Sequence, residues 1–462
     1  MDTKYSQIMN EIKEEITNGT LRAGTKIPSI RYLSEKYACS KNTIIKAYNE
    51  LEKQHYIYSI PKSGFFVVND VTPSQDIPTT QRVDFHSAGP DKEAMPYEDF
   101  QHCVNQAIDL YKGELFSYSH QQGFLSLRKQ LVKHLQDRQV FTTPERLFVL
   151  SGSQQAIHLL VPLPFPNGKS NILIEQPTYF GIVESIRLHN VKAFGIELTM
   201  KGINLERLEY IFRHNDIKFF YVVPRFQNPL GHSYSNEEKR KIVELAIKYD
   251  VYIVEDDILG DLDTNFKSDP IFTYEPTGRV IYIKSFSKIM LPGLRIGVTV
   301  LPELLINNFL RHKFSSDLFS ATISQGALEL YLKNGMFNGH IERIRKLYST
   351  KMEKVQLACE LYLSPQSYNY TKPDTGFYLC IYLPKEVQAN RLVVALQQEN
   401  VFVDDATRMY LPEFQKENLI RLCISQVDEA QIVFGIKTIA KYINLLKNQE
   451  VRLVEKPNHL FL

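Results

Sequence analysis

Cysteine is scarce in this sequence and poorly placed for pairing. Five cysteines are scattered over 462 residues, an odd number with no two in a CxxC arrangement. This usage is typical of reduced thiols and excludes a disulfide framework or a cysteine zinc site. We therefore expect a cytoplasmic protein that carries no metal.

Long apolar runs are also missing. No stretch approaches the ~20 apolar residues that a membrane span needs. The N-terminal stretch MDTKYSQIMNEIKEEI has acidic residues and no apolar segment of the kind found in signal peptides. We expect no membrane as a partner.

Neither sign of charge dominates. The chain has 54 Lys and Arg against 52 Asp and Glu, a formal net charge of +2. Bulk charge therefore cannot bind nucleic acid, and such a role would need one basic region. Hydrophobic residues make up 44% and charged residues 23%, which is typical of a folded protein. The length allows about two to four domains, and the absence of a fixed-period repeat excludes solenoids and propellers.

One segment breaks the apolar pattern. Residues 69–81, NDVTPSQDIPTTQ, contain two prolines and seven Ser, Thr, Asn or Gln residues. Such a composition indicates a linker. We predict a domain at 1–68, a linker at 69–81 and a second domain at 82–462.

The first domain shows three helical patterns followed by a hairpin. Apolar residues at helical spacing stop at Asn18-Gly19, Pro28-Ser29 opens a second short helix, and Ser40 opens a third that extends to about residue 53. Two β-rich stretches, 55–60 and 65–68, flank a basic turn, PKSG. The order predicts a winged helix-turn-helix, in which the third helix enters the major groove of DNA.

The charge of this domain fits that role. Residues 1–68 hold ten Lys and Arg against seven Asp and Glu, and four of the acids lie on the first helix, away from the expected DNA face. The residues placed to contact phosphates are Lys26, Arg31, Lys41, Lys46 and Lys62, and those placed for bases or backbone are Asn42 and Thr43. The alternative is a helical packing module with solvated lysines.

A resemblance favours the first interpretation. The segment GTKIPSIRYLSEKYACSKNTIIKAYNELEKQHYIYSIPKSGFFV resembles the GntR-type winged helix of bacterial transcription regulators, and the match covers residues 4–68. It implies that Arg31, Lys41, Thr43 and the wing from Lys62 to Gly64 contact double-stranded operator DNA. It also implies a bacterial cytoplasmic protein that is nucleoid-associated when bound to DNA.

After the linker, strand-like runs alternate with amphipathic helical stretches. We predict strands at 147–150, 171–174, 218–223, 251–255, 280–284 and 296–300. This alternation is typical of an α/β fold with a largely parallel central sheet covered by helices on both faces. Ligands bind at the carboxyl ends of such strands.

The residues at those ends match the needs of pyridoxal phosphate. That cofactor requires an imine lysine, an acid at the pyridine nitrogen, a donor to the phenolic oxygen, a stacking ring and a phosphate site. The candidates in that order are Lys288, Asp256, Asn228 and Tyr179, with Ser153, Gln154, Ser285, Ser287 and Arg295 for the phosphate. Each residue alone has an ordinary structural interpretation, but five correctly typed strand ends in order favour the cofactor.

The same motifs resemble those of fold type I, aspartate-aminotransferase-like enzymes. The similar segments are SFSKIMLPGLRIG, SGSQQAI, QNPLG, VEDD and NLIRLCIS. The resemblance implies a small C-terminal α+β subdomain and a carboxylate-binding role for Arg421. It further implies a homodimer in which Tyr118 reaches the phosphate of the partner subunit's cofactor. A winged helix linked to this fold resembles the MocR-type subfamily of GntR regulators.

Two positions depart from the family pattern. Ile258 stands two residues after the acid, where most relatives have a tyrosine that contacts the phenolic oxygen, and Leu230 replaces threonine in Asn-Pro-Thr-Gly. The lost tyrosine removes a donor to the phenolate and implies weak transamination at most.

Three functions are compatible with these features. The leading one is a transcription regulator that senses an amine or amino acid through aldimine exchange at Lys288. The second is a working aminotransferase with a secondary DNA-binding module, and in the third pyridoxal phosphate is itself the signal. Phe180 and Gly181, beside Tyr179, bring no cation, which disfavours a diacid effector.

Overall fold

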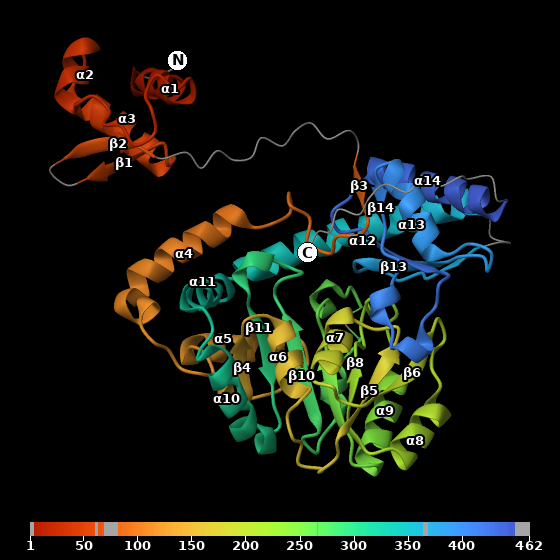
Figure 1. Cartoon of the computed structure of the whole chain (residues 1–462). Helices are drawn as coiled ribbons and strands as arrows, with labels where there is room; N and C mark the ends of the chain where they lie inside the picture. The colour runs from red at the N-terminus through yellow and green to blue at the C-terminus, as the bar shows by residue number, and fades with distance from the viewer. Residues whose placement is uncertain (1–3, 61–62, 69–81, 266, 364–367, 449–462) are drawn as a thin grey trace. The chain divides into compact units, whose positions relative to one another are not determined.

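The computed structural model describes residues 4–60, 63–68, 82–265, 267–363 and 368–448. The predicted linker, 69–81, and the wing residue Lys62 lie outside these ranges. The chain divides into two compact units between Thr79 and Thr80. In Figure 1 the first unit is red, and the second runs from orange through green to blue. Each unit is described by itself.

The N-terminal unit contains three helices and an antiparallel hairpin. Its elements are α1 (Lys4–Thr17), α2 (Ile30–Lys36), α3 (Lys41–Lys53), β1 (Ile57–Ile60) and β2 (Gly64–Val67). Helices α2 and α3 begin where predicted because Ser29 and Ser40 cap them, each accepting a backbone N–H of the first turn. The core contains Ile44, Ala47, Tyr48 and Leu51 of α3, together with Ile8, Ile12, Ile27, Leu33, Ile57 and Val67.

The second unit is built on an eight-stranded sheet of order β4-β11-β10-β9-β8-β5-β6-β7. Its strands are β4 (Leu147–Leu150), β5 (Asn171–Gln176), β6 (Ala193–Thr199), β7 (Gly202–Ile203), β8 (Ile217–Val222), β9 (Tyr252–Asp256), β10 (Val280–Ser285) and β11 (Gly297–Val300). Only β11 and β7 run antiparallel to their neighbours in this sheet. The predicted strands all belong to it, and β6 and β7 are two further strands that were not predicted.

Helices cover both faces of this sheet (Figure 1). They are α4 (Tyr97–Tyr111), α5 (Leu125–Gln136), α6 (Ser153–Leu160), α7 (Phe180–Leu188), α8 (Leu205–His214), α9 (Asn236–Lys248), α10 (Glu303–Asp317) and α11 (Thr322–Lys333). Alternate residues of β8 supply the two faces: Phe219 and Tyr221 pack in the same cluster as α6 and α7, while Phe220 and Val222 pack with α8 and α9. The alternation follows from the two-residue period of a strand.

A smaller subdomain gathers around the long helix α12 (Met336–Tyr362). It contains an antiparallel sheet of β12 (Asn369–Tyr370), β13 (Tyr378–Tyr382) and β15 (Leu419–Cys423), and the helices α13 (Ala389–Gln398) and α14 (Glu429–Lys447). A second, parallel pair joins β3 (Val83–Asp84) to β14 (Val401–Phe402). The residues that follow the linker are therefore built into the C-terminal subdomain.

Candidate functional site

A cavity of about 420 Å³ lies at the carboxyl ends of the parallel strands. Nine residues named from the sequence line it: Ser153, Gln154, Tyr179, Asn228, Ser285, Ser287, Lys288, Arg295 and Arg421. They come from segments that are up to about 270 residues apart, and the parallel strand order brings them to one edge of the sheet. The predicted strand-end cluster is therefore a single concave site.

Lys288 follows β10 and faces this cavity. Its Nζ atom donates a hydrogen bond to the carbonyl oxygen of Ala88 at 2.5 Å. Burial disfavours the ammonium form and lowers the pKa of Lys288 to about 8. A substantial fraction of the amine is thus neutral near pH 8, as a nucleophile must be.

Asp256 ends β9 and is fully buried. Its Oδ2 atom accepts a hydrogen bond from the Tyr221 hydroxyl at 2.6 Å, while Oδ1 has no hydrogen-bond partner among the described residues. Desolvation raises the pKa of Asp256 to about 7. A buried carboxyl with one unpartnered oxygen fits a protonated ring nitrogen, which would donate to it and favour its ionised form.

The phosphate end of the site is formed by a strand–turn–helix. Ser153 and Gln154 lie in the first turn of α6, whose N–H groups have no partner within the helix and favour an anion. The Arg295 guanidinium donates to the carbonyl of Ser151 at 3.2 Å, and the Ser287 hydroxyl has no hydrogen-bond partner among the described residues. The Gln154 side chain instead donates to Gly181 and Ser185 on α7, so Gln154 offers the phosphate its backbone N–H.

Arg421 on β15 is 2% exposed and held by several acceptors. Its Nη2 atom donates to the carbonyl of His86 at 2.7 Å and lies 2.9 Å from Asp404 Oδ2. Its Nη1 atom donates weakly to Asn228 Oδ1 at 3.5 Å. The buried cation is therefore already paired with a carboxylate of the chain itself, a feature absent from the sequence prediction.

Several residues that line the cavity were not predicted from the sequence. His86, Ser87, Ala88 and Gly89 come from the segment after β3, and Arg408 comes from the loop after β14. The guanidinium of Arg408 lies 4.3 Å from the ring centre of Phe180. The prediction that no cation stands beside Tyr179 is therefore wrong, because a loop more than 200 residues away supplies one.

Ile258 and Tyr118, both singled out from the sequence, differ in their position relative to the cavity. Ile258, the departure from the family pattern, lines the cavity and offers no hydrogen-bond donor. Tyr118 does not line it: its side chain is 89% exposed and packs edge-on against Phe319. An exposed position is what a residue serving a partner subunit would need.

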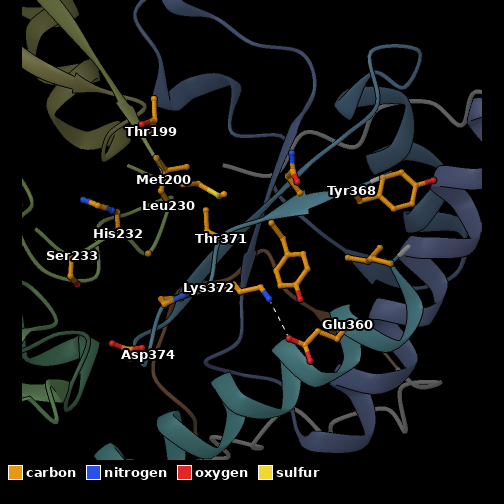
Figure 2. Close-up of a pocket in the computed structure, with 15 residues that line it drawn as sticks. Thr199, Met200, Leu230, His232, Ser233, Glu360, Tyr368, Thr371, Lys372 and Asp374 are labelled. Carbon is orange, nitrogen blue, oxygen red and sulfur yellow. Dashed lines mark hydrogen bonds and ion pairs between the residues drawn. The ribbon is translucent and has the colours of Figure 1, made fainter. Parts of the chain in front are cut away.

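A second cavity, of about 810 Å³, lies away from this chemistry (Figure 2). It is formed by the β6–β7 turn, the loop at 230–233, Glu360, Leu363 and residues 368–374. The ion pair between Lys372 and Glu360, 3.2 Å long, crosses its wall. None of the residues predicted for cofactor binding lines it, so volume alone would identify the wrong site.

In the N-terminal unit, α3 presents Lys41, Asn42 and Lys46 to solvent. Thr43 is half-buried, and its hydroxyl lies 2.9 Å from that of Ser40 at the helix cap. Lys26 is exposed, Gly64 begins β2, and Arg31 forms an exposed pair with Glu35 at 3.3 Å. Lys62 lies outside the described residues. The described basic residues are thus available for phosphates, while Thr43 also has a structural role.

The described residues form neither a metal-binding cluster nor a membrane-spanning helix. Within the described ranges, no group of three or more His, Cys, Asp and Glu side chains could hold a metal ion. The same residues include no helix long and apolar enough to cross a membrane.

Comparisons with known proteins agree with both units. Residues 4–67 match the model of bacterial regulatory proteins, gntR family, and residues 91–439 match aminotransferase class I and II. The HTH-type transcriptional regulator YcxD of Bacillus subtilis is 42% identical over 95% of this chain and its own full length. The probable rhizopine catabolism regulatory protein MocR of Rhizobium meliloti is 25% identical over 94% of this chain and 92% of that protein.

A solved structure resembles the second unit. Kynurenine aminotransferase from Pyrococcus horikoshii, in complex with PMP, is 28% identical, with a TM-score of 0.74 over 81% of this chain and 93% of that chain. Pyridoxal phosphate is the cofactor of this fold, and the residues described above fit it. The chain therefore belongs to the aminotransferase class I and II family and, with its gntR-family domain, has the architecture of MocR-type transcription regulators.

Proposed function

We propose that this protein binds pyridoxal phosphate and uses it to sense an amine or amino acid that changes its affinity for operator DNA. When bound, the cofactor supplies an aldehyde that condenses with primary amines and a ring that withdraws electrons. The observation that carries the proposal is the joining, in one chain, of a gntR-family domain to a cavity lined by Lys288 and Arg421 and backed by Asp256.

The residues of the site divide this task. Lys288, with its lowered pKa, is the amine that an effector amine replaces. Asp256 holds the proton on the ring nitrogen, and the first turn of α6 and Arg295 hold the phosphate. Arg421 receives the carboxylate of an amino acid. Tyr221 donates to Asp256, so it does not substitute for the tyrosine that Ile258 replaces.

Two contacts support a route from the effector to the linker. The carbonyl of Ala88 accepts from Lys288, and the carbonyl of His86 accepts from Arg421. Both carbonyls lie on the segment that leads away from the predicted linker. An effector that engages Lys288 and Arg421 changes both contacts, which gives it a different free energy of interaction in two conformations of this segment.

One preparation of the full-length protein tests this function. Operator affinity and amino-group transfer are measured together, with pyridoxal phosphate alone and with a panel of amino acids. We expect at least one amino acid to change operator affinity while transfer stays well below ordinary enzyme rates, on the order of 1 s⁻¹. Fast transfer with no effect of any amine on DNA binding would support the aminotransferase instead. A response to pyridoxal phosphate alone would make the cofactor the signal.

A further inference from the structure

Two arginines that line the cofactor cavity, Arg408 and Arg421, pair with the same oxygen of Asp404, which is not itself a lining residue. Asp404 Oδ2 lies 2.9 Å from Nη2 of Arg421 and 3.5 Å from Nη2 of Arg408. Asp404 is 4% exposed, and its other carboxylate oxygen accepts the N–H of Ala406 at 2.8 Å. Asp404 is therefore the internal counter-ion of two arginines that both line the cavity, and the same oxygen lies 3.9 Å from Nδ1 of His86, another lining residue.

The other cationic residues of the cavity face partners elsewhere in the site. The described lining residues include Lys288 and four arginines but no Asp or Glu. Arg225 is committed to a buried ion pair with Asp257, and Arg295 lies at the phosphate end, where a phosphate group carries about two negative charges. Lys288 would be linked to the cofactor as an imine. Arg408 and Arg421 are left with one carboxylate between them, so one further negative charge balances this pair.

The free donors of Arg421 are also sufficient for one further carboxylate. Its Nη2 atom donates a hydrogen bond to the His86 carbonyl and lies at ion-pair distance, 2.9 Å, from Asp404 Oδ2. Nε has no hydrogen-bond partner among the described residues, and Nη1 has only the 3.5 Å contact to Asn228. These two atoms are what the chain offers to a carboxylate of the effector.

We propose that the effector is an amino acid with a single acidic group and that Asp404 imposes this limit. The inference rests on the proposed function, since it specifies the ligand of the same site. A second carboxylate near Arg408 would meet the buried carboxylate of Asp404, and like charges repel strongly where water is excluded. A neutral polar side chain of the same shape meets no such penalty, so Arg408 can accept it.

The test uses pairs of amino acids that differ in one charge and little in shape. Glutamine is compared with glutamate, and asparagine with aspartate, by titrating the visible absorption of the full-length protein loaded with pyridoxal phosphate. We expect each amide to bind at least ~10-fold more tightly than its acid, which corresponds to ~1.4 kcal/mol. Asp404→Asn should reduce this preference by a similar factor.

Asp405→Asn is the matched control, because it removes the same charge one residue away, where the carboxylate accepts the N–H of Thr407 at 3.0 Å. It should leave the preference unchanged. Arg408→Gln changes the charge in the opposite direction and should enlarge the preference, which keeps the idea testable if Asp404→Asn fails to fold.

Equal or tighter binding of the acids by the wild-type protein would overturn the inference, as would identical preferences in the Asp404 and Asp405 variants. An unchanged or smaller preference in Arg408→Gln would do the same. If no amino acid changes the absorption spectrum or operator affinity, the proposed function itself fails, and this result is distinct from binding without discrimination.

Discussion

Lys288 and Asp256 share one physical cause for their unusual acid–base behaviour, the removal of water around them. Burial lowers the pKa of Lys288 to about 8 and raises that of Asp256 to about 7. Both shifts disfavour the charged form, so the cofactor-free site is held in a partly neutral state. Binding pyridoxal phosphate would use the neutral amine and give Asp256 a positive partner, which relieves both costs.

Asp256→Asn should therefore have opposite effects with and without cofactor. The pKa of Asp256 is higher in the folded protein than the ordinary 3.8, so its ionisation destabilises the cofactor-free fold progressively as pH rises from about 4 to about 7. The variant should be more stable than the wild type at pH 8, by about 1 kcal/mol or more, and lose this advantage progressively towards pH 4. With pyridoxal phosphate it should bind cofactor more weakly.

Thermal unfolding at the two pH values, with and without cofactor, provides the measurement. Other buried acids, such as Glu175 with its pKa raised to about 8 by burial, are present in both proteins and cancel in the difference. A stability difference that does not depend on pH would contradict the assignment.

Which site residues the sequence could reveal depends on how their positions are determined. Lys288, Asp256 and Asn228 lie at strand ends, where the order of strands alone places them, and local motifs identify them. Asp404 and Arg408 lie in the segment after β14, which has no distinctive motif; Arg408 lines the cavity and Asp404 pairs with Arg421 through tertiary contacts alone. No local pattern in the sequence contains that information.

At the scale of elements, the turn between β4 and α6 depends on one glycine. Gly152 has φ +90°, and a Cβ atom there would lie 2.6 Å from Nη2 of Arg295. Gly152→Ala should displace that guanidinium from the phosphate end and weaken binding of pyridoxal phosphate at least ~10-fold. Cofactor titration by absorbance measures the effect.

Gly278→Ala is the control for this substitution. Gly278 also has a positive φ, +75°, but a Cβ there meets no atom within 4 Å. Both substitutions place an alanine at a positive φ, which strains an L residue, and only the one at 152 also meets Arg295. Equal loss of cofactor affinity in the two variants would show that strain, and not the guanidinium, is responsible.

Helix α3 carries a prediction about DNA. Lys41→Gln at its first turn should weaken operator and non-specific binding alike and lower the salt dependence of binding by about one unit, because one phosphate contact is lost. Lys53→Gln, at the last residue of the helix and paired with Glu50 at 3.8 Å, should change neither. Binding isotherms at several salt concentrations decide, and equal slopes for wild type and Lys41→Gln would remove Lys41 from the interface.

Element boundaries were predictable to different degrees. The strand predicted at 147–150 coincides with β4, because its four buried residues form a continuous apolar run between turns. The paired segments β3, β12 and β14 are two residues long and too short to carry a period. Strand β6 is half-exposed along much of its length, so its sequence lacks the apolar run of a central strand.

At the scale of the whole molecule, we predict that Tyr118, which is exposed in the single chain, serves the cofactor of a partner subunit. If Tyr118 of one subunit serves the cofactor of the other, a heterodimer of Lys288→Ala and Tyr118→Ala subunits contains one fully intact site and one site with both defects. The heterodimer should hold about one cofactor per dimer with wild-type affinity. Differently tagged subunits, purified together and titrated with pyridoxal phosphate, measure this.

The Tyr118→Ala homodimer provides the comparison for the mixed dimer. Its two sites should both bind more weakly than those of the wild type. If the mixed dimer shows only the weakened affinity, Tyr118 acts within its own subunit, and if the homodimer binds as tightly as the wild type, Tyr118 has no role in cofactor binding.

The parallel pairing of β3 with β14 has a mechanical consequence. The N–H of Val83 bonds to the carbonyl of Asn400 and that of Phe85 to Phe402, both at 2.9 Å. Because the strands are parallel, one continues to His86 and the other to Asp404, and both then contact the same nitrogen of Arg421. Tension on the polypeptide at residue 82 would act along the strands and load the hydrogen bonds between β3 and β14 in shear. His86, which contacts the Arg421 guanidinium, lies only four residues further along the chain. A force applied through the predicted linker and a ligand bound in the cavity would therefore both act on the contacts of His86 and Asp404 with Arg421.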